Sequence, residues 1–189
     1  MRVTKFAGAA VAATLAFSGT AFATAIDTTF SVSAFGVLTA STGDITTATT
    51  ISNAGTYKVT SLGTDNTGLA SLGTISLTNP TPVTLGATFT KSFTTSLGIF
   101  TEDLTVTSVQ TGATTLGIDA VGTISETTVS SGSALTSSNV DYTAAYSQNG
   151  AGSSISVSFT DATVVPEPAS LALLGSGLIG LAAFARRRA

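Results

Sequence analysis

The chain has 189 residues, of which 43% are hydrophobic and only 9% are charged, and its formal net charge is −3. A soluble globular chain averages about 25% charged residues, and here Thr and Ser take their place, with 55 of the 142 residues from 24 to 165. Cys, His and Trp are absent, which excludes disulfides, imidazole metal ligands, histidine acid–base catalysis and tryptophan platforms for sugars.

The first 23 residues have the three-part layout of a secretory signal peptide. Arg2 and Lys5 precede an uncharged apolar run over residues 6–17, and Ala21 and Ala23 place small side chains where signal peptidase requires them. We therefore expect cleavage after Ala23 and a mature chain that begins at residue 24. The alternative, a buried helix at the start of a cytosolic domain, does not account for the small residues at this distance from the apolar run.

From residue 24 to 165 the apolar residues recur with period 2, which is typical of half-buried strands. The clearest example is a predicted β-hairpin around the loop Gln-Asn-Gly-Ala-Gly, in which the alternating apolar residues are Val140, Tyr142, Ala144 and Tyr146 before the loop and Ile155, Val157 and Phe159 after it. Further strands are predicted at Phe30–Leu38, Tyr57–Leu62, Thr74–Thr78, Val83–Phe93, Leu104–Val109 and Leu116–Ile124.

This segment is predicted to fold as one all-β domain. Leu, Ile, Val and Phe make up about a quarter of it, above the roughly 20% below which disorder becomes the default. Alternation with Thr and Ser gives each strand one apolar and one hydroxyl face, so two sheets burying their apolar faces predict an antiparallel β-sandwich of Greek-key or jelly-roll type. A Thr-rich solenoid, suggested by Thr-Thr-Ala-Thr-Thr at residues 46–50, is the alternative, but no repeat period supports it.

The sequence predicts no catalytic, cofactor-binding or metal site in this domain. Glu102 and Asp103 are its only adjacent carboxylates, and neighbouring strand residues point to opposite faces, so we expect solvated charges at a turn or edge and not a converging acid–base pair. Asp65 and Asn66 carry oxygen ligands that calcium accepts, but their spacing is not that of a calcium loop, and a turn is predicted.

The charge of the domain excludes nucleic acid as a partner. Residues 24–165 carry two lysines and nine carboxylates, a net charge of −7, and such a domain repels a phosphate backbone. The carboxylates are spread singly along the chain, which predicts a role in solubility and not a binding patch.

The C-terminal region has the features of a short membrane span. Residues 169–185 carry no charge and reach about 26 Å as a helix, which is just enough to cross a hydrocarbon core. Arg186, Arg187 and Arg188 follow directly, and the bias of basic residues toward the cytoplasm places this end of the predicted transmembrane helix inside. The residues between the two apolar runs are therefore expected on the far side of the membrane.

A Pro-Glu-Pro tripeptide precedes this span. Pro166 and Pro168 favour an extended backbone around Glu167, which makes the segment accessible to a processing enzyme. Tripeptide, apolar segment and arginines, in this order, closely resemble the PEP-CTERM sorting signal of Gram-negative bacteria. The resemblance covers residues 166–189 and implies cleavage near the tripeptide by an exosortase, a multi-pass membrane protein of bacteria that make exopolysaccharide. An ordinary C-terminal anchor is the alternative, but an anchor needs no Pro-Glu-Pro.

Three segments are thus predicted: a signal peptide (1–23), a Ser/Thr-rich β domain (24–165) and a sorting signal (166–189). We expect an exported structural or interaction protein of the cell surface or extracellular matrix, without enzymatic activity or cofactor. Its expected partners are signal peptidase, an exosortase and, transiently, the inner membrane. A weak lectin-like module for exopolysaccharide is the alternative, with Tyr57, Tyr142 and Tyr146 available to stack on sugars, and a secreted hydrolase ranks last.

Overall fold

The computed structural model describes residues 24–164, and all regular structure in this range is β-strand. The strands are β1 (Thr28–Phe35), β2 (Leu38–Ala40), β3 (Thr50–Asn53), β4 (Thr56–Asp65), β5 (Thr74–Leu77), β6 (Thr81–Pro82), β7 (Thr88–Thr94), β8 (Gly98–Thr111), β9 (Thr115–Val129), β10 (Ser138–Gln148) and β11 (Ile155–Val164). Within the described residues, no helix has the length and apolar character that crossing a membrane requires. The predicted signal peptide and the predicted transmembrane helix at 169–185 lie outside this range.

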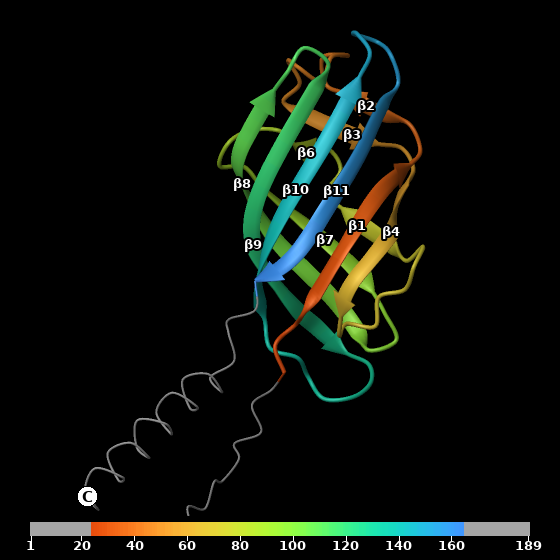
Figure 1. Cartoon of the computed structure of the whole chain (residues 1–189), viewed down its shortest axis with the longest axis vertical. Coiled ribbons are helices and arrows are strands. Elements are labelled where there is room, and N and C mark those ends of the chain that lie inside the picture. The colour runs from red at the N-terminus through yellow and green to blue at the C-terminus, as the bar shows by residue number, and fades with distance from the viewer. Residues whose placement is uncertain (1–23, 165–189) are drawn as a thin grey trace, which may run out of the picture.

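Eight strands form a closed antiparallel barrel in the order β1-β11-β10-β9-β8-β7-β5-β4 (Figure 1). β1 closes it, because it pairs with β11 on one side and with β4 on the other. Around the barrel the strands follow their order in the chain, so each connection joins neighbours. The remaining strands, β2, β3 and β6, form a separate three-stranded sheet.

The prediction of an antiparallel all-β domain is confirmed, but the predicted sandwich of Greek-key or jelly-roll type is wrong. Sandwich and barrel strands both bury one face, so period-2 alternation does not separate the two folds. Closure depends on strand length and register. β8 and β9 are 14 and 15 residues long, and register shifts within the β8–β9 and β1–β4 pairs allow the sheet to bend onto itself.

Both ends of the barrel are covered. At one end the loop before β3 packs on the β10–β11 turn: Ile45 N donates to Gln148 Oε1 (2.8 Å), and Gln148 Nε2 donates to Gly43 O (3.0 Å). At the other end, Ile26 is fully buried beneath the β9–β10 connection, where Ser138 Oγ donates to its carbonyl. Figure 1 shows β2 and β3 at the first end and this connection at the second.

The described chain enters and leaves the barrel at the same end. Thr28 N, at the start of β1, donates to Thr163 Oγ1 near the end of β11 at 2.9 Å, and Figure 1 shows the two strand ends side by side. The segments that precede residue 24 and follow residue 164 are therefore attached at one pole of the domain.

Aromatic side chains fill the barrel interior, as expected for eight strands, whose lumen is about as wide as side chains can fill. The Phe93 ring stacks on Phe100 and meets Phe30 edge-on, and the Tyr142 ring packs against Phe89 and Phe159, with centroids 5.3–5.6 Å apart throughout. Outward positions are mostly polar, and β10 alternates strictly between buried and exposed residues along its length. The hydroxyl surface predicted from composition is thus the outer wall of the barrel.

One glycine in the barrel wall is required by close backbone approach. A Cβ atom at Gly122, in β9, would lie 1.9 Å from the carbonyl oxygen of Asp103 in β8, whereas a Cβ at Gly117 in the same strand would have its nearest neighbour at 3.7 Å. We expect Gly122→Ala to lower the free energy of unfolding by about 2–3 kcal/mol and the matched Gly117→Ala variant to change it by less than about 0.5 kcal/mol. Urea unfolding followed by circular dichroism measures the free energy of unfolding of both variants. Equal losses in the two variants would contradict the β8–β9 register, which brings Gly122 against Asp103.

Candidate functional site: a buried lysine–carboxylate cluster

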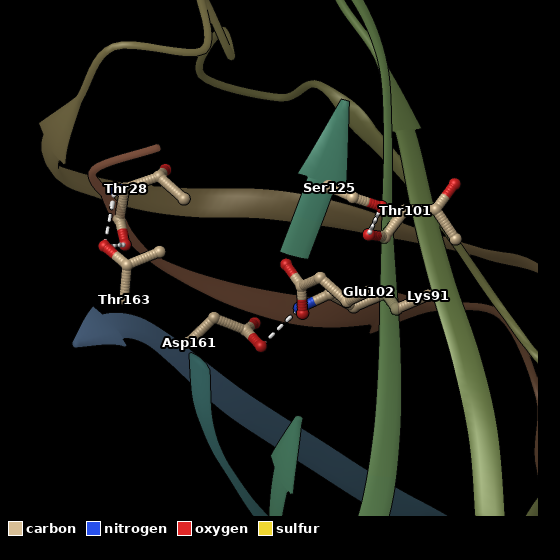
Figure 2. Close-up of polar contacts among 7 residues, drawn as sticks. All are labelled: Thr28, Lys91, Thr101, Glu102, Ser125, Asp161 and Thr163. Atoms are coloured by element: carbon tan, nitrogen blue, oxygen red, sulfur yellow. Dashed lines mark hydrogen bonds and ion pairs between the residues drawn. The ribbon is translucent and has the colours of Figure 1, made fainter. Parts of the chain in front are cut away.

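Glu102 and Asp103 point to opposite sides of β8, as the strand geometry predicts. Asp103 is exposed, but Glu102 is fully buried inside the barrel, so the prediction of a solvated turn or edge charge is wrong for Glu102. Glu102 pairs in register with Lys91 on β7. Asp161, on β11, is directed to the same point in the interior (Figure 2). Two carboxylates that are distant in sequence therefore converge on one lysine.

The three side chains form a compact ion cluster. Lys91 Nζ lies 2.6 Å from Glu102 Oε2 and also pairs with Asp161 Oδ1, and all three side chains have no solvent exposure. They are the only charged side chains that are buried within residues 24–164. No backbone or hydroxyl group elsewhere in this range hydrogen-bonds to them. The ion pairs with Lys91 are therefore the contacts that hold one oxygen of each carboxyl, Glu102 Oε2 and Asp161 Oδ1.

The cluster spans the barrel. In the closed order of strands, three strands separate β7 from β11 in either direction, so Lys91 and Asp161 come from opposite walls. Asp161 pairs in register with Phe30 on β1 and with Tyr142 on β10. These facing residues hold the Asp161 carboxyl in an aromatic section of the interior.

Aromatic rings surround the ammonium group of Lys91. Its Nζ lies 4.7 Å from the ring centroid of Phe30, 5.6 Å from that of Tyr142 and 5.7 Å from that of Phe159. Ring faces attract a cation, and the attraction is stronger where water is excluded. The hydroxyls of Tyr142 and Tyr146 have no hydrogen-bond partner within residues 24–164, and burial raises the pKa of both phenols well above their ordinary value. The surroundings of the cluster are therefore largely aromatic and inaccessible to bulk solvent.

Burial changes the protonation of the two carboxyls. It raises the pKa of Glu102 to about 8 despite the opposing charge of Lys91, and the charge of Asp161 acts in the same direction as burial. Burial also raises the pKa of Asp161, again against the effect of Lys91. At neutral pH we therefore assign a proton to Glu102, which leaves the Lys91–Asp161 ion pair as the charged part of the cluster. The cluster is then neutral overall, as burial away from solvent favours.

This arrangement cannot act on a dissolved substrate, because none of its atoms reaches solvent. No group of His, Cys, Asp or Glu among residues 24–164 has the geometry of a metal site. A turn is predicted for Asp65 and Asn66, but Asp65 is instead the last residue of β4, and the bend begins at Asn66. The Asp65 carboxylate accepts hydrogen bonds from Thr67 N (3.0 Å) and Leu69 N (2.9 Å) in this bend. These bonds use the oxygens that a calcium ion would need.

The outer wall carries an open groove of about 760 Å³ across β8, β9, β10 and β11. Its floor includes Gly117 and Ala145, which face each other across the β9–β10 pair. Hydroxyl groups of Ser147, Ser156 and Ser158 line its sides. The groove is shallow because the outward residues of this region are small.

The tyrosines that the sequence offered for sugar stacking are unavailable at the surface. Tyr57, Tyr142 and Tyr146 are all buried, with 5% exposure or less. Among the phenylalanines of residues 24–164, Phe35 is exposed and the others are in the core. A sugar on the outer wall would therefore meet hydroxyls, amides and carboxylates instead of these tyrosine rings.

The residues predicted to direct processing lie outside the described part of the chain. They are Ala21, Ala23, Pro166, Glu167, Pro168, Arg186, Arg187 and Arg188. Fold and sequence together define a closed β-barrel domain followed directly by a C-terminal tail. This tail, residues 164–188, matches the PEP-CTERM protein-sorting motif. The motif is that of exported proteins sorted by an exosortase and directed through the cell envelope to the surface. No curated protein and no solved structure matches the chain.

Sequence reasoning missed the cluster although each member carries a signal. Lys91 lies between Phe89 and Phe93 in the alternation, and Glu102 lies between Phe100 and Leu104. Asp161 follows Phe159 at the same spacing. Period 2 places each of these residues on the apolar face of its strand, so the sequence could have predicted one inward lysine and two inward carboxyls. It could not have predicted that the three side chains contact one another, because that contact depends on barrel closure.

Proposed function

We propose that the chain is an exported structural or interaction protein of the cell surface or extracellular matrix of a Gram-negative bacterium, and that it is not an enzyme. The observation that carries this proposal is the PEP-CTERM protein-sorting motif at residues 164–188, which starts at the last residue of β11. The barrel before it is closed, filled with aromatic side chains and covered at both ends. Such a domain is suited to persist outside the cell as a folded module.

The position of the two barrel ends supports this role. Because Thr28 and Thr163 are hydrogen-bonded neighbours, the signal peptide and the sorting tail are attached at the same pole. While residues 169–185 hold the chain at the inner membrane, the rest of the barrel projects away from the lipid. Signal peptidase would act after Ala23 and an exosortase near Pro166, both next to this pole and outside the folded domain.

A second candidate function, binding of exopolysaccharide, is favoured by the groove on the outer wall. Hydroxyls line it, and the exposed Asp141 and Asp103 lie on the same wall. Groups of this kind exchange hydrogen bonds with water for hydrogen bonds with sugar hydroxyls, and each exchange contributes little net free energy. We therefore expect each groove to bind a sugar unit weakly, and the repeated units of the polysaccharide to supply the overall affinity.

A matched pair of variants on β10 separates the two functions. Ala145→Arg fills the groove, whereas Thr143→Arg places the same side chain on the same face outside the lining. If the role is structural, both variants reach the surface fraction in the amount of the parent, and neither differs from it in co-sedimentation with the cell's polysaccharide. A loss of co-sedimentation of tenfold or more in Ala145→Arg alone would overturn the structural proposal in favour of polysaccharide binding.

A further inference from the structure

We propose that Lys91 and Asp161 become joined by an intramolecular amide bond between Nζ and Cγ, formed inside the folded barrel with Glu102 as the acid–base group. Lys91 Nζ already contacts a carboxyl oxygen of Asp161, and Glu102 Oε2 lies 2.6 Å from the same nitrogen. Figure 2 shows the carboxyl groups of Glu102 and Asp161 both directed at the end of the Lys91 side chain. The site is a modification site built entirely from this chain, and it is independent of the function proposed above.

The reaction is a condensation that balances without any co-reactant. A proton passes from the ammonium of Lys91 to the carboxylate of Asp161, which yields a neutral amine and a neutral acid. The lone pair of Nζ attacks Cγ of Asp161 and forms the C–N bond. A second proton leaves the nitrogen, one C–O bond of Asp161 breaks, and one water molecule departs. No atom is oxidised or reduced, and Glu102 ends in its starting protonation state.

Glu102 is placed to move the protons. With its proton, it donates to the Asp161 carboxyl and makes Cγ more electrophilic, and its oxygens then take the proton that the nitrogen loses. Its raised pKa of about 8 keeps this proton available at neutral pH. A carboxyl group in contact with both reacting groups provides the acid and base that the same reaction lacks in water.

The interior of the barrel favours the amide over the ion pair. In water, hydration of the separate ammonium and carboxylate opposes condensation. Here the rings of Phe30, Tyr142 and Phe159 replace that water, so the charged reactants lose hydration that the neutral amide does not need. Fixed contact between the groups also supplies an effective concentration on the order of 10⁵ M or more.

Asp161 is the acceptor and Glu102 the proton carrier, and not the reverse. Lys91 and Glu102 already face each other on the paired strands β7 and β8. A covalent bond between them would therefore only join two strands that backbone hydrogen bonds already connect. A bond to Asp161 joins opposite walls and encloses β8, β9 and β10 in a covalent loop from residue 91 to 161. It would do for this Cys-free domain what disulfides do for other exported domains.

Trypsin provides a direct test on the full chain exported by a bacterial host. Between Lys5 and Arg186 the chain has only two tryptic sites, Lys58 and Lys91, and an amide at Nζ prevents cleavage after Lys91. We expect one fragment that starts at residue 59 and continues past residue 91 without cleavage. Its mass should be lower than the mass of its sequence by one water. Chymotrypsin should then release residues 90–93 joined to the peptide that follows Phe159.

Two variants identify the role of Glu102. Glu102→Gln retains the shape but not the proton transfer, and we expect bond formation to slow by about 10²-fold or more, so that cleavage after Lys91 returns. The control Asp103→Asn, which changes the neighbouring exposed carboxylate, should remain cross-linked. Separate fragments 59–91 and 92 onward from the parent chain at full mass would overturn the proposal, and so would a bond to Glu102. The result for the parent chain decides the question even if Glu102→Gln does not fold.

Discussion

Replacing Pro166, Glu167 and Pro168 together with alanine should retain the full-length protein in the inner membrane. Export through the N-terminal signal should be unaffected, because that signal acts first and independently. The apolar residues 169–185 and the arginines after them then remain as an anchor with its C terminus in the cytoplasm. We expect the surface form to fall to background and the membrane form to take its place.

The measurement is cell fractionation, with an epitope tag inserted at Gly132. This glycine lies in the exposed β9–β10 connection, and no atom lies within 4 Å of the Cβ that a side chain would add. A variant with Ser170 and Ser176 changed to alanine serves as the control, since it alters the tail but preserves the tripeptide and the arginines. Arrival of the triple variant at the surface in parental amounts would mean that the tail is a plain anchor.

Stability should fall as the pH rises from about 4.5 to 8, which is opposite to the behaviour of a protein with salt-bridged surface carboxylates. The pKa of Glu102 is raised from 4.5 to about 8 in the fold, so between these values the folded state holds a proton that the unfolded state has lost. Stability is then complete below pH 4.5 and decreases by about 1.4 kcal/mol per pH unit over most of the range up to pH 8. The total change is on the order of 5 kcal/mol.

The sign is the same with or without the proposed amide bond, because Glu102 is buried in either case and the bond removes the cation that opposes its protonation. Asp161, where free, adds to the effect, since burial raises its pKa as well. The phenols of Tyr142 and Tyr146 titrate above this range. Urea unfolding at pH 5, 6, 7 and 8 measures the slope.

Glu102→Gln, which mimics the protonated acid, should remove most of the slope, and the exposed-site control Asp103→Asn should keep it. A stability that rises from pH 5 to pH 8 in the parent protein would show that Glu102 is ionised in the barrel. The neutral cluster described above would then be incorrect.

Sequence alone was sufficient for the class of fold and for most strands. Alternation located β4, β5, β10, β11 and the first part of β9, because apolar inward residues there alternate with outward residues that are mostly polar or small. It missed β3 and β6, which are two to four residues long. It also joined parts of β1 and β2 into one strand across Gly36, where the chain turns. Short strands contain too few residues to show a period.

Barrel closure could not be predicted from the sequence, for a different reason. The residue pattern of β1 indicates only that one face of the strand is buried, whereas closure requires that its two edges pair with β4 and β11. Those pairings join residues far apart in the chain, and no local propensity encodes them. The buried cluster depends on the same closure, since Lys91 and Asp161 come from strands with no direct hydrogen bonding between them.

The most direct measurement of export and sorting is the intact mass of the form isolated from the cell surface. We expect a chain that begins at Thr24 and ends near Pro166-Glu167-Pro168, without the apolar residues 169–185 and the terminal arginines. A surface form that still carries residues 169–189, or one that retains residues 1–23, would contradict the assignment of this protein as a processed substrate of the sorting pathway.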